Sequence, residues 1–172
     1  MTSLRLTLAL ALTLSACTNY GTPSLDRADV PMRDAMGRDL GTLTLSSTTG
    51  GLILTGVVSG LPAGVHGIHL HTTGRCDPPF ESAGAHWNPA SRMHGTLNPQ
   101  GPHLGDMPNI DVSSAGSATV SVTTPGGTLR GTNGLLDSDG AAVVIHAQAD
   151  DYRTDPSGNS GARIACGVVR GN

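Results

Sequence analysis

Short apolar segments separated by glycine-rich turns recur along most of this chain. Leu43 and Leu45 lie before the Gly50–Gly51 turn, and Leu52 and Leu54 lie after it. Short apolar segments on both sides of a glycine turn are typical of a β-hairpin. Further strands are expected at 65–71, 117–123, 141–147 and 163–170.

The pattern favours an all-β fold. No window of about 10 or more residues has a convincing helical period. The chain has 24 glycines and only 2% aromatic residues, so its core must be built from Leu, Val, Ile and Ala. Repeated short strands joined by glycine-rich turns indicate a β-sandwich or barrel. Segments 72–110 and 150–161 interrupt the strands, and loops this long are usually functional.

The N-terminus is expected to be a targeting segment. Arg5 precedes an apolar stretch at 6–14, which is too short for a bilayer that needs roughly 20 apolar residues. The sequence Leu-Ser-Ala-Cys ending at Cys17 is typical of bacterial lipoprotein processing; the alternative is an ordinary secretory signal. We therefore expect an exported lipoprotein, periplasmic or at the cell surface, anchored to a membrane through lipid on Cys17. Its parts would be a signal peptide at 1–16, a tether at 17–36 and one domain at 37–172.

Charge and cysteines narrow the function further. The net charge is −3, and all ten basic residues are arginines. With lysine absent there is no polybasic stripe, so we do not expect the protein to bind nucleic acid. Three cysteines are an odd number, but lipid on Cys17 leaves Cys76 with Cys166. A disulfide between them would close a loop of about 90 residues and stabilise the fold by roughly 4–5 kcal/mol. A pair of buried free thiols is the alternative.

All seven histidines fall at spacings that indicate metal binding. His69 and His71 lie two apart on an expected strand, so both point to one face and can bind one metal. His146 ends an apolar segment, where an unpartnered imidazole would be costly to bury, and it would be a third ligand. His66 has the opposite parity and is expected to form structural hydrogen bonds.

The long loop carries the second half of this pattern. His86, His94 and His103 are followed by Asp106, among prolines and glycines that favour tight turns. Three imidazoles and a carboxylate make a tetrahedral zinc shell, and imidazole also suits copper. The sequence therefore indicates a site for two metals.

Four segments of the chain resemble motifs of the copper/zinc superoxide dismutases and follow one another in the same order as in that family. Segment 64–71 is similar to the first copper-ligand strand of that family, and 83–89 to its bridging-histidine segment. Segment 103–106 resembles the end of the zinc loop, and 161–168 the C-terminal signature. The similarity extends from about Leu40 to Val169. It implies an eight-stranded antiparallel Greek-key β-barrel or sandwich with two long functional loops, copper and zinc as cofactors, and dismutation of superoxide.

The resemblance also implies roles for single residues. The copper ligands would be His69, His71, His86 and His146. The zinc ligands would be His86, His94, His103 and Asp106, with His86 shared by both ions. Asp150 would link the ligands His69 and His94, and Cys76 and Cys166 would form the family's disulfide. His86 and Arg163 would be catalytic, the first as a proton donor and the second as a fixed charge over the open copper face.

Some questions stay open at this point. The second loop is short and has no lysine; Arg153 could attract superoxide, although Asp151 and Asp155 oppose it. A catalytically inactive metal-holding relative and a zinc-only structural module are the rival functions. A monomer and a homodimer are equally compatible with the sequence.

Overall fold

A computed structural model describes residues 26–171 of the protein. Cys17, the signal peptide at 1–16 and the first part of the tether lie outside the described residues. The strands are β1 (Arg27–Asp34), β2 (Asp39–Thr48), β3 (Gly51–Ser59), β4 (Gly64–His66), β5 (Ile68–His71), β6 (Ile110–Val112), β7 (Ser117–Pro125), β8 (Ala142–His146), β9 (Arg163–Val168) and β10 (Arg170–Gly171). One turn of 3-10 helix, η1, spans Glu81–Ala83.

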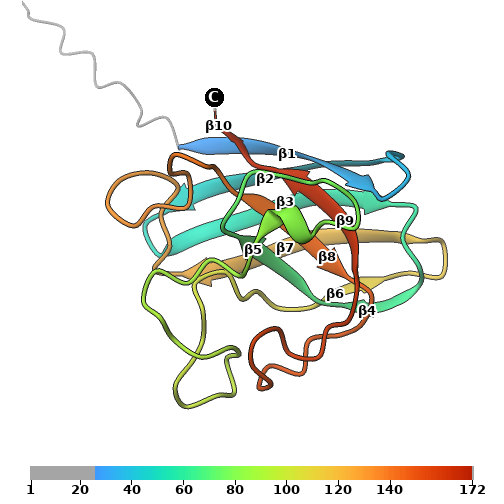
Figure 1. Ribbon diagram of the computed structural model, residues 1–172. Coiled ribbons are helices and arrows are strands. Elements are labelled where there is room, and N and C mark those ends of the chain that lie inside the picture. The colour runs from blue at the N-terminus through green and yellow to red at the C-terminus, as the bar shows by residue number, and fades with distance from the viewer. Residues whose placement is uncertain (1–25, 172) are drawn as a thin grey trace, which may run out of the picture.

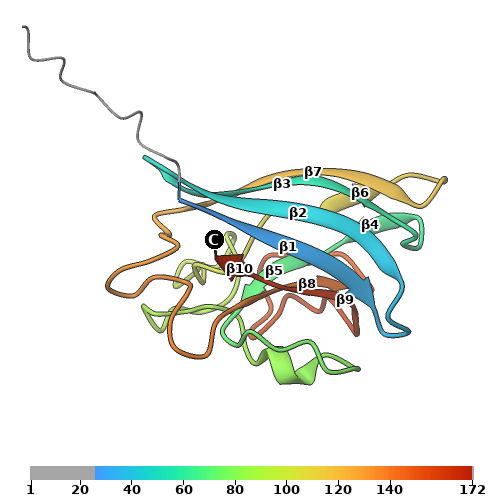
Figure 2. The same ribbon diagram turned by 90° about the horizontal axis from the view of Figure 1, so that it is seen from above.

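The strands form an antiparallel barrel. One sheet has the order β5-β8-β9-β1-β2-β3-β7, with β10 beside β1, and a second pairs β4 with β6. Gly67 separates β4 from β5, which are halves of one extended segment, and β6 packs against β7. With β4 and β5 counted as one, eight strands close in the order β1-β2-β3-β7-β6-β4/β5-β8-β9. Because β3 lies beside β7 and β9 beside β1, the connections are Greek-key, which confirms the expected fold class. Figure 2 shows the barrel as two layers, with β1, β2, β3 and β7 facing β5, β8 and β9.

The interior follows from alternation along the strands. In β7 every second residue from Ala118 to Thr124 is buried, and the residues between them are exposed. Leu43, Leu45 and Leu54 of the predicted hairpin are fully buried between the layers. The core is therefore aliphatic, as the composition predicts.

One expectation is wrong: residues 27–34, assigned to the tether, form strand β1. Ala28, Val30 and Met32 are fully buried on one face of it. Pro31 fits in this strand because it pairs with β2 at a point where neither β9 nor β10 pairs with β1. Its missing N–H therefore breaks no sheet hydrogen bond on that side. Among residues 26–171, no helix is long and apolar enough to cross a membrane.

Both long loops lie at one end of the barrel (Figure 1), where the yellow-green segment after β5 meets the red segment between β8 and β9. A disulfide joins Cys76 of the first loop to Cys166 of β9, with 5.7 Å between their Cα atoms. This confirms the disulfide, and it ties the long loop to the barrel beside the site described next.

Candidate metal centre

The long loop returns along the open edge of β5 and completes the site. Leu70 donates its backbone N–H to the carbonyl of Gly105, and its own carbonyl accepts from Trp87. Gly105 is required here because a Cβ atom at this position would lie 2.4 Å from the Leu70 carbonyl oxygen. The loop therefore adds to the sheet edge and brings His86 and Asp106 opposite His71 and His69.

Four buried histidines form the first ligand set: His69, His71, His86 and His146. Each offers one ring nitrogen, and these atoms all lie within 4.8 Å of one another. The opposite nitrogen of each ring faces an oxygen: Nε2 of His69 lies 2.9 Å from Asp150, and Nδ1 of His71 lies 3.0 Å from the Gly84 carbonyl. A ring that donates its N–H to an oxygen keeps a lone pair on its other nitrogen.

The second ligand set comes from the loop alone. Oδ1 of Asp106 lies 2.8 Å from Nδ1 of His86, 3.1 Å from Nδ1 of His94 and 3.2 Å from Nδ1 of His103. Around a tetrahedral zinc with bonds of about 2.0–2.1 Å, neighbouring ligand atoms are about 3.3 Å apart. The other oxygen of Asp106 accepts the backbone N–H groups of Gly95 and His103, which fixes the carboxylate.

Six buried ring nitrogens make a direct test of whether metals fit. They belong to His69, His71, His86, His94, His103 and His146, and none has a hydrogen-bond partner among the described residues. A buried polar atom without a partner costs about 1–3 kcal/mol. Since these nitrogens belong to the two ligand sets, two cations would satisfy them, and the donor types suit copper on one side and zinc on the other.

His86 is the residue common to both sets. Its Nδ1 faces Asp106, and its Nε2 has no partner. The ring lies 4.0 Å from the His69 ring, between centroids, and 5.5 Å from the His103 ring. One imidazole can therefore contact an ion on each side.

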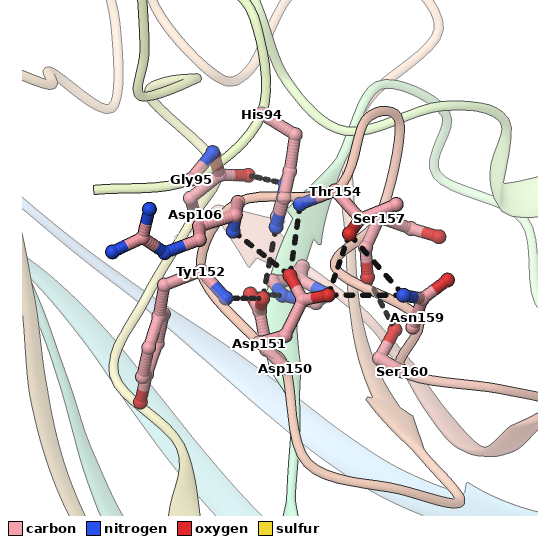
Figure 3. A network of polar contacts seen from close by, with 12 residues as sticks. His94, Gly95, Asp106, Asp150, Asp151, Tyr152, Thr154, Ser157, Asn159 and Ser160 are labelled. Atoms are coloured by element: carbon pink, nitrogen blue, oxygen red, sulfur yellow. Dashed lines mark hydrogen bonds and ion pairs between the residues drawn. The ribbon is translucent and has the colours of Figure 1, made fainter. Parts of the chain in front are cut away.

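Asp150 connects the two ligand sets from behind. One carboxylate oxygen lies 2.9 Å from Nε2 of His69, and the other lies 2.9 Å from Nε2 of His94. The second oxygen also accepts the backbone N–H of Tyr152 (Figure 3). Gly158 leaves room for this carboxylate, because a Cβ atom there would lie 1.8 Å from it.

The electrostatics of the metal-free site favour the metal-binding form of every ligand with a shifted pKa except His94. Burial lowers the pKa of His69 to about 3 and that of His146 to about 4, so both rings are neutral at pH 7. Burial acts to raise the pKa of Asp106 and Asp150, but the histidine rings close to each carboxylate outweigh it and hold both pKa values well below the usual range. Burial also acts to lower the pKa of His94, yet the same two carboxylates raise it to about 9 without metal.

A cavity of about 660 Å³ opens over His86 and His146. Arg163 lines it, and its guanidinium donates hydrogen bonds of 2.8 Å to the carbonyls of Phe80 and Gly84. These bonds hold a positive charge at the wall of the cavity. A small anion in this cavity therefore has the positive charge of Arg163 on the same wall as His86 and His146.

Two residues that the sequence analysis considered, His66 and Arg153, are not part of the ligand sets. The ring of His66 is in neither set: its nitrogens lie 2.8 Å from the His146 carbonyl and 2.9 Å from the Pro62 carbonyl. Arg153, considered for attracting superoxide, is not among the residues that line the cavity. Asn109, whose side chain hydrogen-bonds the backbone of Asp150, was not anticipated, because a lone asparagine carries no pattern in the sequence.

A fold and a site of this kind define a two-metal β-barrel protein, and comparison with known proteins identifies the class. The family described as copper/zinc superoxide dismutase (SODC) matches residues 40–169. Copper–zinc superoxide dismutase 1 of Aquifex aeolicus is 46% identical over 138 residues, covering 78% of this chain and 82% of the relative.

Solved structures agree with the sequence comparison. The crystal structure of a SOD-like protein from Bacillus subtilis superposes with a TM-score of 0.78 and 41% identity, covering 82% of this chain and 97% of the other. The Cu/Zn superoxide dismutase from Brucella abortus has a TM-score of 0.69 and 29% identity, covering 84% of this chain and 100% of the other. The chain belongs to the copper/zinc superoxide dismutase family. Its reaction is the dismutation of superoxide, with copper and zinc as cofactors.

Proposed function

We propose that specific residues divide this reaction between two metals. Copper is bound by His69, His71, His86 and His146, and zinc by His86, His94, His103 and Asp106. The observation that carries this assignment is the set of six buried ring nitrogens without hydrogen-bond partners in residues 26–171.

When bound, copper supplies one-electron redox chemistry and zinc supplies a fixed charge without redox change. Two superoxide anions and two protons give dioxygen and hydrogen peroxide, so the site must deliver protons as well as electrons. Nε2 of His86 has no other partner, and His86 lines the cavity. We assign it as the atom that would take up a proton whenever it is not bound to copper, and that would donate this proton to the reduced oxygen species as a general acid.

Arg163 attracts and orients the substrate. Guanidinium stays charged at every physiological pH, and its two bonds to backbone carbonyls restrict where that charge lies. Asp150 positions the ligands, because it faces one ring of each set. Carboxylates that hold a ligating histidine in this way contribute about 10–100-fold to metal affinity.

The location is a further part of the proposal. We propose that residues 1–16 are removed, that Cys17 is lipidated and that the domain works outside the cytoplasm, in the periplasm or at the cell surface. The disulfide supports an oxidising compartment. Cys17→Ala should release the protein from the membrane fraction, and continued membrane association would refute lipidation at Cys17. Sedimentation of the released protein measures whether it forms a homodimer.

Metal analysis of the oxidised protein together with a superoxide assay tests the proposed function. We expect one copper and one zinc per chain and rapid turnover, whereas His146→Ala should lose copper and activity and keep zinc. Full metal content without turnover would mean a metal-holding protein. Zinc without copper would mean a structural module, and either result would contradict the proposal.

A further inference from the structure

The cavity over the metal centre has four charged residues on its wall: Glu81, Arg92, Asp155 and Arg163. They come from different elements. Arg163 belongs to β9 and Glu81 to η1, whereas Arg92 belongs to the loop with the zinc ligands and Asp155 to the second long loop. Their pairing decides how much positive charge an approaching anion meets.

Arg163 does not act as an isolated charge. Its guanidinium lies 3.6 Å from the carboxylate of Glu81, whose side chain is 75% exposed. An exposed carboxylate this close reduces the field of Arg163 outside the cavity and repels anions itself. Glu81 therefore weakens the attraction that Arg163 exerts on an anion outside the cavity.

Asp155 is directed toward the zinc ligands. Its Oδ1 accepts the backbone N–H of His94 at 2.7 Å and lies 3.8 Å from Nε2 of His103. Its charge is therefore partly offset by these donors, and more fully so once a cation is bound between the neighbouring ligands.

Arg92 is the cation of this wall that has no acidic partner. Within the described part of the chain, no carboxylate lies within ion-pair distance of its guanidinium, which donates to the Gly101 carbonyl at 2.7 Å. Asn88 fixes the backbone of Arg92 through two hydrogen bonds. Its side-chain oxygen accepts the Arg92 N–H at 2.9 Å, and its side-chain amide donates to the Arg92 carbonyl at 2.8 Å. The charge is thus exposed, held in place and available to an anion.

The second long loop offers no such charge. Its one arginine, Arg153, is not among the residues lining the cavity. The loop is folded around Asp151, which accepts hydrogen bonds from Arg153, Thr154 and Asn159 (Figure 3).

We propose that Arg92 is the second anion-attracting residue of the cavity and that Glu81 opposes it. Superoxide is guided by the loop that carries the zinc ligands, and the second loop contributes no attracting charge. This inference rests on the proposed function, because it assumes that the anion which enters is the substrate.

Neutralising each charge separately tests the proposal. A unit charge acting through water over about 10 Å changes the local concentration of a monovalent anion about twofold. At low ionic strength, Arg92→Gln should therefore lower the second-order rate constant for superoxide about twofold, and Glu81→Gln should raise it about twofold. Both differences should shrink above roughly 0.15 M salt, where the Debye length falls below about 8 Å.

Two matched controls remove the same charges elsewhere. Arg153→Gln and Asp111→Asn change exposed residues outside the cavity, and their rate constants should equal that of the unmodified enzyme. Pulse radiolysis over a series of salt concentrations gives the rate constants. Equal effects of Arg92→Gln and Arg153→Gln, or no effect of Arg92→Gln, would overturn the proposal.

Azide binding to the resting copper enzyme gives a readout that does not depend on turnover. Its dissociation constant, measured by visible absorption, should rise about twofold in Arg92→Gln and fall in Glu81→Gln at unchanged copper and zinc content. If the unmodified holoprotein turns over superoxide and these shifts are missing, only the present inference fails. If the unmodified holoprotein has no turnover, the proposed function fails and this inference with it.

Discussion

Asn109 and Asp150 are joined by a closed pair of hydrogen bonds. The side-chain amide of Asn109 donates to the Asp150 carbonyl at 2.9 Å, and the Asp150 backbone N–H donates to the Asn109 side-chain oxygen at 2.9 Å. The asparagine side chain thus pairs with the backbone as a neighbouring strand would. It fixes the start of the second loop, and with it the carboxylate that faces His69 and His94.

Asn109→Ala should weaken metal binding without unfolding the barrel. Without the amide, Asp150 loses its fixed position, and both ligand rings lose the partner that orients them. We expect zinc and copper affinity to fall about 10–100-fold, measured by competition with chelators. Asn159→Gly is the control, because among residues 26–171 the Asn159 side chain bonds only to Asp151 and Thr154 of the same loop, and glycine adopts its φ of 52° without strain. Equal affinities in the two variants would show that Asn109 does not position Asp150.

Breaking the disulfide should destabilise the domain and release metal. Cys76 and Cys166 are 90 residues apart, and the entropy of closing such a loop corresponds to roughly 4–5 kcal/mol of unfolding free energy. Urea unfolding of Cys76→Ser/Cys166→Ser, compared with the oxidised protein, measures this loss. A double variant with the same unfolding midpoint and metal content would contradict the structural role.

The metal-free protein should be most stable near pH 6.5. His69 and His146 have pKa values of about 3 and about 4 when folded and about 6.5 when unfolded, so only the unfolded chain takes up their protons as the pH falls from 6.5 toward 4. Each group lowers the unfolding free energy by about 1.4 kcal/mol per pH unit in that window.

His94 acts in the opposite direction. Its pKa of about 9 in the folded protein means that the folded chain holds a proton that the unfolded chain has lost between pH 6.5 and 9, so stability also falls as the pH rises through that window. Urea titrations from pH 5 to 9 measure both limbs. Metal binding displaces the His94 proton, so the alkaline limb should disappear in the loaded protein. A monotonic profile for the metal-free protein would contradict these assignments.

The sequence predicts most of this fold because alternation and turn glycines are local signals. The hairpin around Gly50–Gly51 is β2 and β3, and the expected strands at 117–123 and 141–147 are β7 and β8. The segment at 65–71 is divided at Gly67 into β4 and β5. Strand β1 was missed because Pro31 is compatible with a strand only where one side is unpaired, and this depends on tertiary structure.

The residues of the candidate site also fall into two groups, those that local sequence signals reveal and those that depend on tertiary structure. Histidine spacing and family resemblance point to the ligands because their residue types are distinctive. The roles of Asn109, Arg92 and Glu81 depend on contacts between segments distant in sequence or brought to one cavity wall, which no local pattern encodes. Arg153 shows the converse, since a suitable residue type in the expected loop lies away from the cavity.

The central claim is that one imidazole, that of His86, is shared by copper and zinc. A crystal structure of the metal-loaded protein with anomalous diffraction at both absorption edges tests it directly. We expect zinc about 2.0–2.1 Å from Nδ1 of His86 and copper near its Nε2, with each ion surrounded by its own ligand set. An ion bound away from this ring, or a single ion in place of two, would contradict the account.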